Sequence, residues 1–310
     1  MKAFILAAGF GSRLMPITTF TPKPLIPVLN LPSICYTLTF LKEAGIEKVI
    51  CNVHHHAGHI RRFFSENHNF GMDVHISEET AILGTGGGLK RCENLLDEEP
   101  FILINSDIIA DFNLKSFIDY HNNSGNAGSL MLYETPEAKA IGDVGIHEDR
   151  IVDFRNMRKT GLRSDYIYAG AALLSPSIFH YLSPCFSSIV DTGFTGLIEH
   201  ESLGYFPHDG FWQDIGTMHT LWQANIPNRE HILQIGNRIH RQTGVAPHVL
   251  SSDAVIAQNA TVEDSIVGSN CRIEDGAIIR HSVLLPETVI AQGTSIERSI
   301  AFPGGLITVD

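Results

Sequence analysis

A short, fixed repeat near the C-terminal end constrains the fold of this chain more than any other feature. Single apolar residues recur there at steps of 6, 5, 6, 6, 5, 6 and 6, at Ile256, Val262, Val267, Ile273, Ile279, Leu284, Ile290 and Ile296. Steps of 6, 6 and 5 give a period of 17, which Ser265, Ser282 and Ser299 also follow. Self-similarity at a fixed short period predicts a solenoid, in which each coil buries its apolar residues against the next. The alternative is a meander of short strands with accidental spacing.

The step of six residues, with one apolar residue per step, resembles the hexapeptide-repeat left-handed β-helix. We therefore assign residues 248–310 to a short left-handed β-helix. Such repeats form acyltransferase modules in other proteins, so a bifunctional enzyme with acyl transfer on the β-helix is one hypothesis. Roughly three coils, without a catalytic His in an obvious insertion loop, favour packing and homo-oligomerisation, because hydrophobic coils need a neighbour or a cap.

The N-terminal half alternates short apolar strands with helical segments. The expected strands are Lys2–Ala8, Lys48–Val53, Met72–Ser77, Phe101–Asn105 and Ala127–Tyr133, and the expected helices are Ser33–Gly45, His59–Asn67, Gly87–Leu96 and Asn113–His121. This alternation indicates βαβ units. We predict an α/β fold with a Rossmann-like mixed, mostly parallel sheet and flanking helices over residues 1–225. A connector of residues 226–247 then leads to the β-helix.

Charge and cysteine usage exclude several classes of protein. Lys and Arg number 22 against 34 Asp and Glu, a formal net charge of −12. This balance argues against nucleic acid or an anionic membrane as partner, because both need a basic surface. No apolar run reaches the roughly 18 residues of a membrane-spanning helix. The five cysteines are scattered without metal-binding spacing, so reduced thiols in the cytoplasm are the simplest interpretation.

A glycine-containing turn, Leu6–Leu14, follows the first predicted strand. Gly9 and Gly11 permit backbone angles that turn N–H groups inward, where they can bind phosphate oxygens. Arg13 adds a guanidinium that can bind phosphate. The turn lacks the Gly-Lys-Ser/Thr of a Walker A loop and the third glycine of a dinucleotide-binding fingerprint. An ordinary strand-to-helix turn explains these residues equally well when they are taken alone.

Lys23 follows shortly after this turn and stands between Pro22 and Pro24. The two prolines stiffen the backbone on both sides. Lys23 is therefore a pre-positioned cation, which can stabilise negative charge that builds up in a transition state. A solvated loop lysine is the alternative.

Two isolated carboxylates stand in apolar surroundings. Asp107 comes just after the predicted strand Phe101–Asn105, and Asp214 lies in the segment Trp212–Thr217. Two carboxylates together with phosphate oxygens are the usual ligands of Mg²⁺. Each aspartate is also a plausible helix N-cap or turn residue, and Asn113 is a further capping candidate near Asp107.

Three consecutive histidines, His54–His56, invite a zinc interpretation. Successive residues of an extended chain point in alternating directions, so three of them do not converge easily on one ion. A loop at the mouth of a cleft is the better interpretation.

Taken together, these motifs resemble the sugar-1-phosphate nucleotidyltransferases. The resemblance rests, in order along the chain, on Leu6–Leu14 with Lys23-Pro24, on Leu83–Leu89, on Asn105–Asp107 and on Trp212–Thr217. With its repeat, the chain is most similar to the mannose-1-phosphate guanylyltransferase-like branch, which carries a C-terminal β-helix. Ser12 stands where many relatives have Thr. The resemblance implies that an NTP and a sugar 1-phosphate react to give an NDP-sugar and pyrophosphate.

The resemblance also implies roles for individual residues. Arg13 and Lys23 would be catalytic, with Arg13 on the β- and γ-phosphates and Lys23 on the α-phosphate. The nucleotide would be bound by Leu6, Ala8, Gly9, Gly11, Ser12, Glu79, Gly87 and Gly88, the last three lining the base pocket. The sugar would be bound by Asn105, Gly145 and Gly170, and Mg²⁺ by Asp107 and Asp214.

The implied reaction suits these residue types. The attacking oxygen of the sugar phosphate is already anionic at neutral pH, so no general base is needed. The enzyme must align two mutually repelling anions and stabilise the leaving pyrophosphate. Arg13, Lys23 and Mg²⁺ supply the positive charge for both tasks.

The substrates are less constrained than the reaction. We expect GTP with mannose 1-phosphate, because the repeat matches the guanylyltransferase-like branch. Uridylyl or thymidylyl transfer to glucose 1-phosphate or N-acetylmuramate 1-phosphate is the alternative, since Thr85–Gly88 resembles a uridylyltransferase acting on N-acetylmuramate 1-phosphate. Many relatives have Glu-Lys-Pro after the strand Ile151–Phe154, with the lysine on the sugar phosphate. Here Arg155, Arg158 and Lys159 are the candidates for that contact.

A non-catalytic relative that senses NDP-sugar is a further alternative. Such relatives usually lose a phosphate-loop arginine, the lysine or a metal-binding aspartate, and this chain retains Arg13, Lys23, Asp107 and Asp214.

Overall fold

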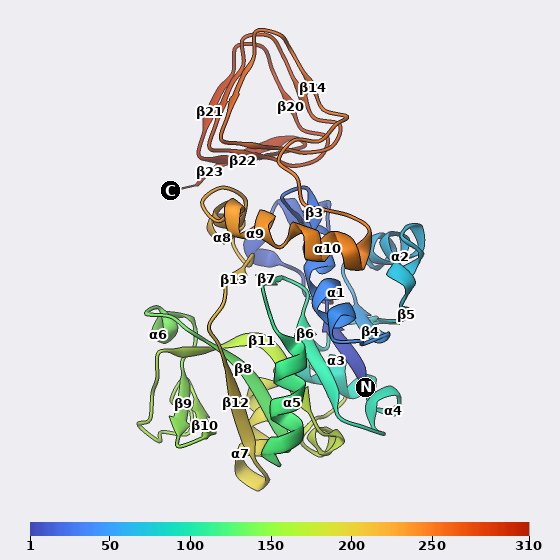
Figure 1. Cartoon of the computed structure of the whole chain (residues 1–310), viewed down its shortest axis with the longest axis vertical. Helices are drawn as coiled ribbons and strands as arrows, with labels where there is room; N and C mark the ends of the chain where they lie inside the picture. The colour runs from blue at the N-terminus through green and yellow to red at the C-terminus, as the bar shows by residue number, and fades with distance from the viewer. Residues whose placement is uncertain (310) are drawn as a thin grey trace. The chain divides into compact units, whose positions relative to one another are not determined.

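A computed structural model describes residues 1–309 of the chain, which fall into two compact units. Unit 1 comprises residues 1–10 and 40–212, and unit 2 comprises residues 11–39 together with the chain from residue 213 onward. Figure 1 shows the elements of both units along the chain. The polypeptide therefore leaves unit 1 in the middle of the turn Leu6–Leu14 and returns to it within the first long helix.

Unit 1 is built on a nine-stranded sheet in the order β5-β4-β1-β6-β11-β8-β12-β10-β9. The strands are β5 (Asp73–Glu78), β4 (Lys48–Val53), β1 (Lys2–Leu6), β6 (Phe101–Asn105), β11 (Tyr166–Leu174), β8 (Gly128–Glu134), β12 (Leu203–His208), β10 (Arg150–Phe154) and β9 (Val144–His147). Only β11 and β10 run against the other seven. The predicted mixed, mostly parallel sheet is confirmed.

The helices of unit 1 lie mostly between successive strands. They are the end of α1 (Ile34–Glu43), then α2 (Ala57–Glu66), α3 (Gly84–Arg91), α4 (Glu93–Leu96), α5 (Leu114–Ser124), α6 (Ala138–Ile141) and α7 (Thr195–His200), with 3-10 turns at His68–Gly71 and Pro176–Tyr181 and a π turn at Val190–Phe194. The helix expected over Gly87–Leu96 is divided at Cys92. Asn113 caps α5 by accepting a hydrogen bond from the Ser116 N–H at 3.1 Å.

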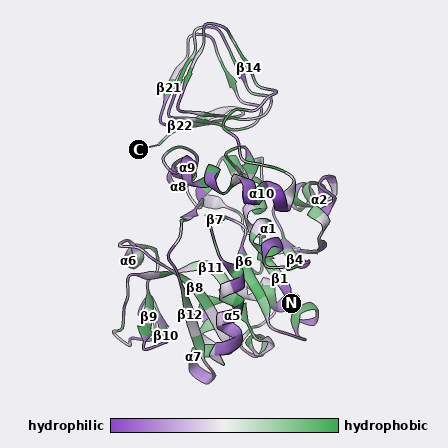
Figure 2. Cartoon of the chain, viewed as in Figure 1, coloured by the Kyte–Doolittle hydropathy of each residue, from purple (hydrophilic) through white to green (hydrophobic). Residues whose placement is uncertain are grey.

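The central strands of unit 1 are apolar on both faces. All but the last residue of β6 is buried, and Phe4 of β1 and Leu103 of β6 belong to one core with Leu130 of β8. Figure 2 shows these strands as hydrophobic ribbon. Burying one such Leu or Phe side chain stabilises the fold by about 1.5–3 kcal/mol, and continuous burial is the pattern of a sheet covered on both sides. Residues 1–309 contain no helix that is long and apolar enough to cross a membrane.

Unit 2 ends in a β-helix of stacked triangular coils (Figure 1). Its three parallel sheets are β14-β17-β20, β15-β18-β21 and β16-β19-β22, the last extended by the antiparallel β23. The strands are β14 (Val255–Ile256), β15 (Thr261–Glu263), β16 (Ile266–Val267), β17 (Arg272–Ile273), β18 (Ile278–Arg280), β19 (Val283–Leu284), β20 (Val289–Ile290), β21 (Ser295–Glu297), β22 (Ser299–Phe302) and β23 (Gly305–Thr308). The predicted hexapeptide-repeat β-helix is confirmed.

The 17-residue period sets the register of these coils. Ile256 pairs with Ile273, which pairs with Ile290, and each residue of this column points into the core of the β-helix. The serines form a second column: the Ser282 N–H donates to Ser265 Oγ at 3.0 Å, and the Ser299 N–H donates to Ser282 Oγ at 3.1 Å. Ser265 and Ser282 thus each satisfy a buried backbone donor of the next coil, which an apolar residue of similar size cannot do.

The rest of unit 2 contains short elements that flank the predicted phosphate-binding turn and the connector. They are the 3-10 turns Ser12–Leu14, Ile17–Thr19 and Lys23–Leu25, the strands β2 (Pro27–Val28) and β3 (Leu31–Pro32), and the helices α8 (Met218–Asn225), α9 (Arg229–Gln234) and α10 (Gly236–Thr243). Strands β7 (Ile108–Ala110) and β13 (Trp212–Asp214) complete the chain.

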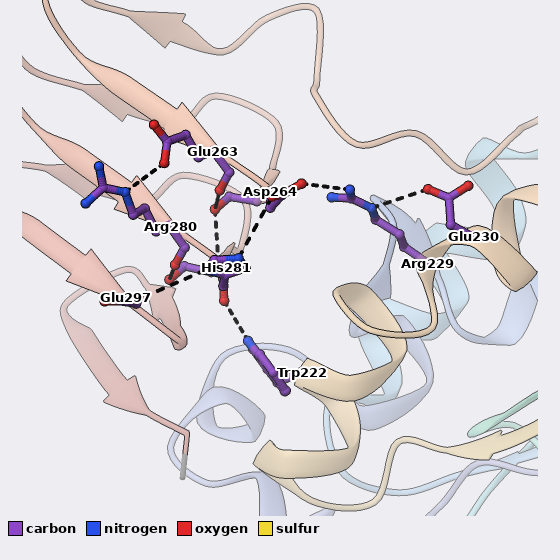
Figure 3. A network of polar contacts seen from close by, with 10 residues as sticks. Trp222, Arg229, Glu230, Glu263, Asp264, Arg280, His281 and Glu297 are labelled. Carbon is purple, nitrogen blue, oxygen red and sulfur yellow. Dashed lines mark hydrogen bonds and ion pairs between the residues drawn. The ribbon is translucent and has the colours of Figure 1, made fainter.

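Within unit 2, one side of the β-helix packs against α8. The column Ile266, Val283 and Ile300 points away from the coil interior yet is at most 1% exposed, and α8 contacts both β22 and β2. Figure 3 shows the polar contacts at the edge of this side, where Trp222 Nε1 donates to the His281 carbonyl at 2.7 Å. Such apolar burial bordered by polar contacts makes the β-helix an integral part of unit 2.

Two cations reinforce the same junction. The Arg298 guanidinium lies 4.8 Å from the centre of the Trp222 ring, within cation–π range. Arg229 forms an ion pair with Asp264 at 2.8 Å. Both contacts join the helices α8 and α9 to corners of the coil.

Candidate active site

The predicted site residues are divided between the two units. Unit 1 holds Leu6, Ala8, Gly9, Glu79, Gly87, Gly88, Asn105, Asp107, Gly145 and Gly170. Unit 2 holds Gly11, Ser12, Arg13, Lys23 and Asp214. The two residues predicted to be catalytic, Arg13 and Lys23, therefore lie in unit 2, whereas the residues predicted to contact base and sugar, and the three cationic candidates for the sugar phosphate, lie in unit 1.

In unit 2, Gly11 brings the glycine turn and Lys23 together. Gly11 has a φ of 61°, a left-handed conformation that favours glycine. A Cβ on Gly11 would stand 2.8 Å from Thr18 Cγ2 and 3.2 Å from Lys23 Cβ. At position 11 the backbone thus lies closer to Lys23 than a residue with a Cβ would permit. The predicted proximity of the turn and the proline-flanked lysine is present within this unit.

The main chain at Lys23 is held by a 3-10 turn and by a hydrogen bond to the residue that follows. Lys23 begins a 3-10 turn after the extended Pro22, with φ −62° and ψ 144°. Ser33 Oγ donates to the carbonyl of Pro24 at 3.0 Å. These constraints fix the main chain at Lys23, so that only the flexible side chain remains to adjust to an anion.

Arg13 and Asp214 meet at Gly216. A Cβ on Gly216 would lie 2.7 Å from Arg13 Nη2 and 2.7 Å from Asp214 Oδ2. The Gly216 N–H donates to Asp214 Oδ2 at 3.2 Å. Directly afterwards, the capping box of Thr217 and Thr220 starts α8. A guanidinium and a carboxylate therefore converge on a short glycine turn at the beginning of a helix.

In unit 1, Asn105 and Gly170 lie together at the carboxyl end of β6. Gly170 has a φ of 89°, and a Cβ there would be 3.0 Å from Asn105 Nδ2. The pairing of β11 with β8 shifts register next to it, between Tyr168 and Ala172. Asp107 follows Ser106, whose hydroxyl donates to the Leu6 carbonyl at 2.7 Å. The predicted sugar-binding and metal-binding residues of this strand thus share one end of the sheet.

Gly145, the third predicted sugar contact, has different neighbours. A Cβ on Gly145 would be 2.5 Å from the Leu162 carbonyl and 2.8 Å from Asp153 Cβ. The glycine therefore allows the loop after β10 to lie close to β9. The sugar contact that the sequence predicts for Gly145 stays a prediction.

The loop after β10 carries the three candidates for the sugar phosphate. Arg155 pairs with Asp191 at 3.3 Å, and Arg158 pairs with Glu199 at 2.5 Å. A cavity of about 460 Å³ lies beside them, lined by Met157, Arg158, Asp191, Thr195 and Glu199. Arg158 is thus the one of the three candidates that lines this cavity.

The same loop is anchored by a buried aspartate. Asp143 is 1% exposed and accepts two hydrogen bonds from the Arg163 guanidinium, at 2.5 Å from Nε and 2.7 Å from Nη2. These bonds to Arg163 lower the pKa of the Asp143 carboxyl.

Glu79 lies at the end of β5, where both its carboxylate oxygens are engaged. Oε1 accepts from Asn52 Nδ2 at 2.7 Å, and Oε2 accepts from the Leu83 N–H at 2.9 Å. Asn52 also accepts from the Ala7 N–H at 2.8 Å. Sequence reasoning missed Asn52, although an amide inside the apolar strand Lys48–Val53 is a signal that could have identified it.

The glycines of α3 permit close backbone packing. The Gly86 N–H donates to the Ser187 carbonyl at 2.9 Å, and a Cβ on Gly87 would stand only 2.1 Å from the Cys185 carbonyl oxygen. A Cβ on Gly88 would meet Glu79 Oε1 at 2.5 Å. Three successive glycines thus fit the start of this helix between two neighbouring segments.

The three consecutive histidines form a ring cluster with Phe10. His54 and His55 lie 5.3 Å and 5.7 Å from the Phe10 ring centre, and His54 Nδ1 contacts the Glu79 carbonyl at 2.8 Å. No group of three or more His, Cys, Asp or Glu side chains in residues 1–309 is arranged to hold a metal ion.

The buried cysteines are poor candidates for a nucleophile. Burial raises the pKa of the Cys35 and Cys51 thiols to about 12, so neither forms the reactive thiolate at neutral pH. Cys185 is the exposed thiol among the five.

Family comparison places this arrangement among known proteins. The profile of the nucleotidyl transferase family matches residues 2–230, and a profile described as the GlmU-like C-terminal hexapeptide matches residues 234–303. The mannose-1-phosphate guanylyltransferase catalytic subunit beta of Drosophila pseudoobscura pseudoobscura is 33% identical over 69% of this chain and 59% of its own length. The mannose-1-phosphate guanyltransferase of Gibberella zeae is 32% identical over 70% of this chain and 61% of its own length. This chain therefore spans about three fifths of those curated relatives.

Three further comparisons extend over more of the matched protein. Mannose-1-phosphate guanylyltransferase 1 of Arabidopsis thaliana is 28% identical over 99% of this chain and 86% of its own length. Among solved structures, a Bacillus anthracis protein assigned as a glucose-1-phosphate thymidylyltransferase matches with a TM-score of 0.66 and 26% identity, over 73% of this chain and 94% of that one. The HddC structure of Yersinia pseudotuberculosis has a TM-score of 0.61 at 22% identity, over 72% of this chain and 97% of that one, and supports the fold alone.

Proposed function

Because this chain belongs to the nucleotidyl transferase family, we propose that it transfers a nucleotidyl group from an NTP to a sugar 1-phosphate. The products are an NDP-sugar and pyrophosphate. GTP with mannose 1-phosphate is the favoured substrate pair, because several curated relatives are named mannose-1-phosphate guanylyltransferases. The bond between the α- and β-phosphates breaks while a sugar phosphate oxygen bonds to the α-phosphorus.

The observation that carries this proposal is the packing of Gly11 against Lys23. A Cβ at Gly11 would be 3.2 Å from Lys23 Cβ, so the glycine turn and the lysine are built as one element. In this proposal the N–H groups of Gly9, Gly11 and Ser12 bind phosphate oxygens. In this proposal Lys23 binds the α-phosphate and Arg13 stabilises the leaving pyrophosphate.

The neutral contacts are assigned to unit 1. Leu6, Ala8, Gly87 and Gly88 would line the nucleotide, and Asn105, Gly145 and Gly170 would contact the sugar. The close approach of Gly170 to Asn105, with a hypothetical Cβ 3.0 Å from Asn105 Nδ2, supports a sugar-facing amide at the end of β6.

Arg158 is the proposed contact for the sugar phosphate, because it lines the cavity beside the β10 loop.

Mg²⁺ fits the donor set of this chain. Asp107 and Asp214 each offer carboxylate oxygens. This matches the habit of Mg²⁺, which is usually held by one or two carboxylates together with substrate phosphates and water. When bound, the ion neutralises phosphate charge. Arg13 and Lys23 act on the same substrate independently of that ion.

We also propose a cytoplasmic location and a homo-oligomer formed through the β-helix. The absence of a disulfide among the five described cysteines supports a reducing compartment. Val255 and Val289 are each 61% exposed and lie on the same outer face, on either side of the exposed Arg272, and these two apolar side chains support a self-association surface. Light scattering of Val255→Glu and of the unchanged chain tests this proposal, since a monomer in both would contradict it.

The test of the reaction is pyrophosphate release across a grid of substrates. GTP, UTP, dTTP, CTP and ATP are each combined with mannose, glucose and N-acetylated sugar 1-phosphates, with and without Mg²⁺. Turnover confined to GTP and mannose 1-phosphate, and dependent on Mg²⁺, is the expected result. Turnover with UTP or dTTP would replace the substrate assignment, and nucleotide binding without turnover would favour a non-catalytic sensor of NDP-sugar.

A further inference from the structure

A buried carboxylate without a cationic partner lies beside the proposed nucleotide site. Glu79 is 2% exposed and forms no ion pair in residues 1–309. Burying a charge is costly unless hydrogen bonds compensate it. Glu79 is compensated only by neutral donors, the Asn52 amide and the Leu83 N–H. A residue held at such cost in this position is expected to do more than fill space.

These hydrogen bonds form a continuous chain between two backbone segments. The Ala7 N–H donates to Asn52 Oδ1 at 2.8 Å, Asn52 Nδ2 donates to Glu79 Oε1 at 2.7 Å, and the Leu83 N–H donates to Glu79 Oε2 at 2.9 Å. Ala7 lies at the end of β1, just before Gly9. Leu83 immediately precedes α3, which carries Gly87 and Gly88. The chain therefore ties the start of the glycine turn to the glycine helix.

Gly88 packs closely against the hydrogen-bonded side chains of Asn52 and Glu79. A Cβ at Gly88 would stand 2.5 Å from Glu79 Oε1 and 2.7 Å from Asn52 Nδ2. The amide of Asn52 is 1% exposed. Both side chains are thus enclosed, and their orientation is dictated by the donors and acceptors around them.

We propose that Asn52 and Glu79 are a positioning pair, which sets the two backbone segments that receive the nucleotide, and that neither side chain contacts it. This inference rests on the proposed function. Glu79 is 2% exposed and packs against Gly88, so its carboxylate has no exposed acceptor to offer to a base. The pair acts through the peptide groups at Ala7 and Leu83.

Single substitutions break the match of donors and acceptors. In Glu79→Gln, the new NH₂ group must face either the Asn52 NH₂ or the Leu83 N–H, both of which are donors. In Asn52→Asp, a second carboxylate faces Glu79. Leaving a buried donor or acceptor unsatisfied is costly, and we expect each variant to raise KM for the nucleotide by about 10- to 100-fold.

The double variant Asn52→Asp/Glu79→Gln restores the match with the charge moved to the other position. The carboxylate at position 52 accepts from the Ala7 N–H and from the amide at position 79. The carbonyl oxygen of that amide accepts from the Leu83 N–H. A positioning role therefore predicts recovery of KM to within about threefold of the unchanged chain, whereas a carboxylate that binds the substrate at position 79 cannot be replaced in this way.

The experiment measures KM and kcat for nucleotide together with amide hydrogen exchange at Ala7 and Leu83. Exchange needs no substrate, so it tests the pair even if the proposed function fails. Faster exchange in both single variants, slow exchange in the double variant and parallel recovery of KM are expected. Unchanged exchange in the single variants would overturn the pair. Restored exchange without restored KM would show that Glu79 contacts the substrate and would overturn the positioning role.

Glu78→Gln is the matched control, because this neighbouring glutamate is exposed and pairs with Arg61 at the surface. Its exchange and KM should equal those of the unchanged chain. If the double variant melts too low to assay, Glu79→Asp keeps the charge but draws the carboxylate back by one methylene. It should raise KM and speed Leu83 exchange together, and a raised KM with unchanged exchange would overturn the positioning role.

Discussion

The two units present their polar residues in opposite ways. In unit 2, Arg13 is exposed and Lys23 only half-buried, at a turn where the backbone is tightly constrained. In unit 1, Asn52 and Glu79 are almost fully buried, and their hydrogen-bonding groups are already paired. The first arrangement keeps charged side chains at least partly accessible to solvent, and the second uses its polar groups to fix the backbone.

This difference follows from the ligand chemistry that we propose for each unit. Phosphates are strongly charged, so a flexible guanidinium or ammonium can reach them while the main chain stays fixed. A base or sugar is distinguished by the placement of hydrogen-bonding groups, which requires a rigid backbone. The comparison predicts that substitutions at exposed cations reduce turnover, and that substitutions at buried polar groups change affinity or stability.

The largest expected effect comes from Arg13→Ala. Removing the guanidinium that stabilises the leaving pyrophosphate should lower kcat by about 10²- to 10³-fold and leave the melting temperature unchanged, since Arg13 is exposed. Steady-state pyrophosphate release measures kcat, and thermal melting measures the melting temperature. Arg280→Ala, which removes an exposed cation of the β-helix paired with Glu263, should retain full activity. An Arg13→Ala variant with normal kcat would contradict the role in turnover that we assign to the exposed Arg13.

Gly11→Ala tests whether unit 2 is constrained at its backbone. The substitution adds a Cβ 2.8 Å from Thr18 Cγ2 at a φ of 61°, which should destabilise unit 2 by about 1–2 kcal/mol and displace Lys23. Chemical denaturation measures the stability. Gly9→Ala is the stability control, because a Cβ there meets nothing within 4 Å. Equal stability of the two variants would contradict the proposed constraint.

The two tryptophans sharpen the comparison because each is anchored in a different unit. Trp212 Nε1 donates to the Ala169 carbonyl at 2.9 Å in unit 1, and Trp222 Nε1 donates to the His281 carbonyl at 2.7 Å in unit 2. Replacing either by Phe keeps an aromatic ring and removes one hydrogen bond, at a cost of about 1 kcal/mol.

Urea unfolding followed by amide hydrogen exchange, read separately for residues of unit 1 and of unit 2, assigns that cost. Trp222→Phe should destabilise unit 2, and Trp212→Phe should destabilise unit 1. A Trp222→Phe variant as stable as the unchanged chain would mean that the junction between α8 and the β-helix is not held by this bond.

The smallest effect is a dependence of stability on pH. Hydrogen bonds from Arg163 lower the pKa of Asp143 in the folded chain below the usual 3.8. The contribution of this pair is therefore present above about pH 4 and is lost as the pH falls through the folded pKa. Asp143→Asn should reduce stability at pH 7 by more than at pH 3, in denaturation curves at both values. The exposed Asp149→Asn should show no such difference, and a constant deficit for Asp143→Asn would exclude the proposed coupling.

The β-helix and the central strands were predictable because local spacing determines them. The 17-residue period of Ile256, Ile273 and Ile290 places those residues in one column, and no long-range contact is needed to infer it. Likewise, the apolar stretch Phe101–Asn105 has the predicted bounds in the structure. Periodicity is visible in sequence whenever one buried face repeats along the chain.

Other features depend on contacts between distant segments and were not predictable. The amide of Asn52 stands out within its apolar strand, but its partners Glu79 and Ala7 are known only from the structure. The boundary between the two units falls within the turn Leu6–Leu14, so that Gly9 and Gly11 belong to different units. The amino-acid composition does not reveal this boundary. Similarly, only the structure places Arg158 beside a cavity and pairs Arg155 with Asp191. The roles of the individual site residues stay predictions.

The most direct test of the account is phosphorus NMR of a mixture of GTP, mannose 1-phosphate, Mg²⁺ and the protein. The account predicts that the mannose 1-phosphate signal and the three GTP signals decline together. Two signals of the sugar-linked diphosphate and one pyrophosphate signal grow, and the pyrophosphate signal has twice the intensity of each of the other two. Formation of GDP with a doubly phosphorylated sugar, or release of orthophosphate alone, would show attack at a different phosphorus and contradict nucleotidyl transfer.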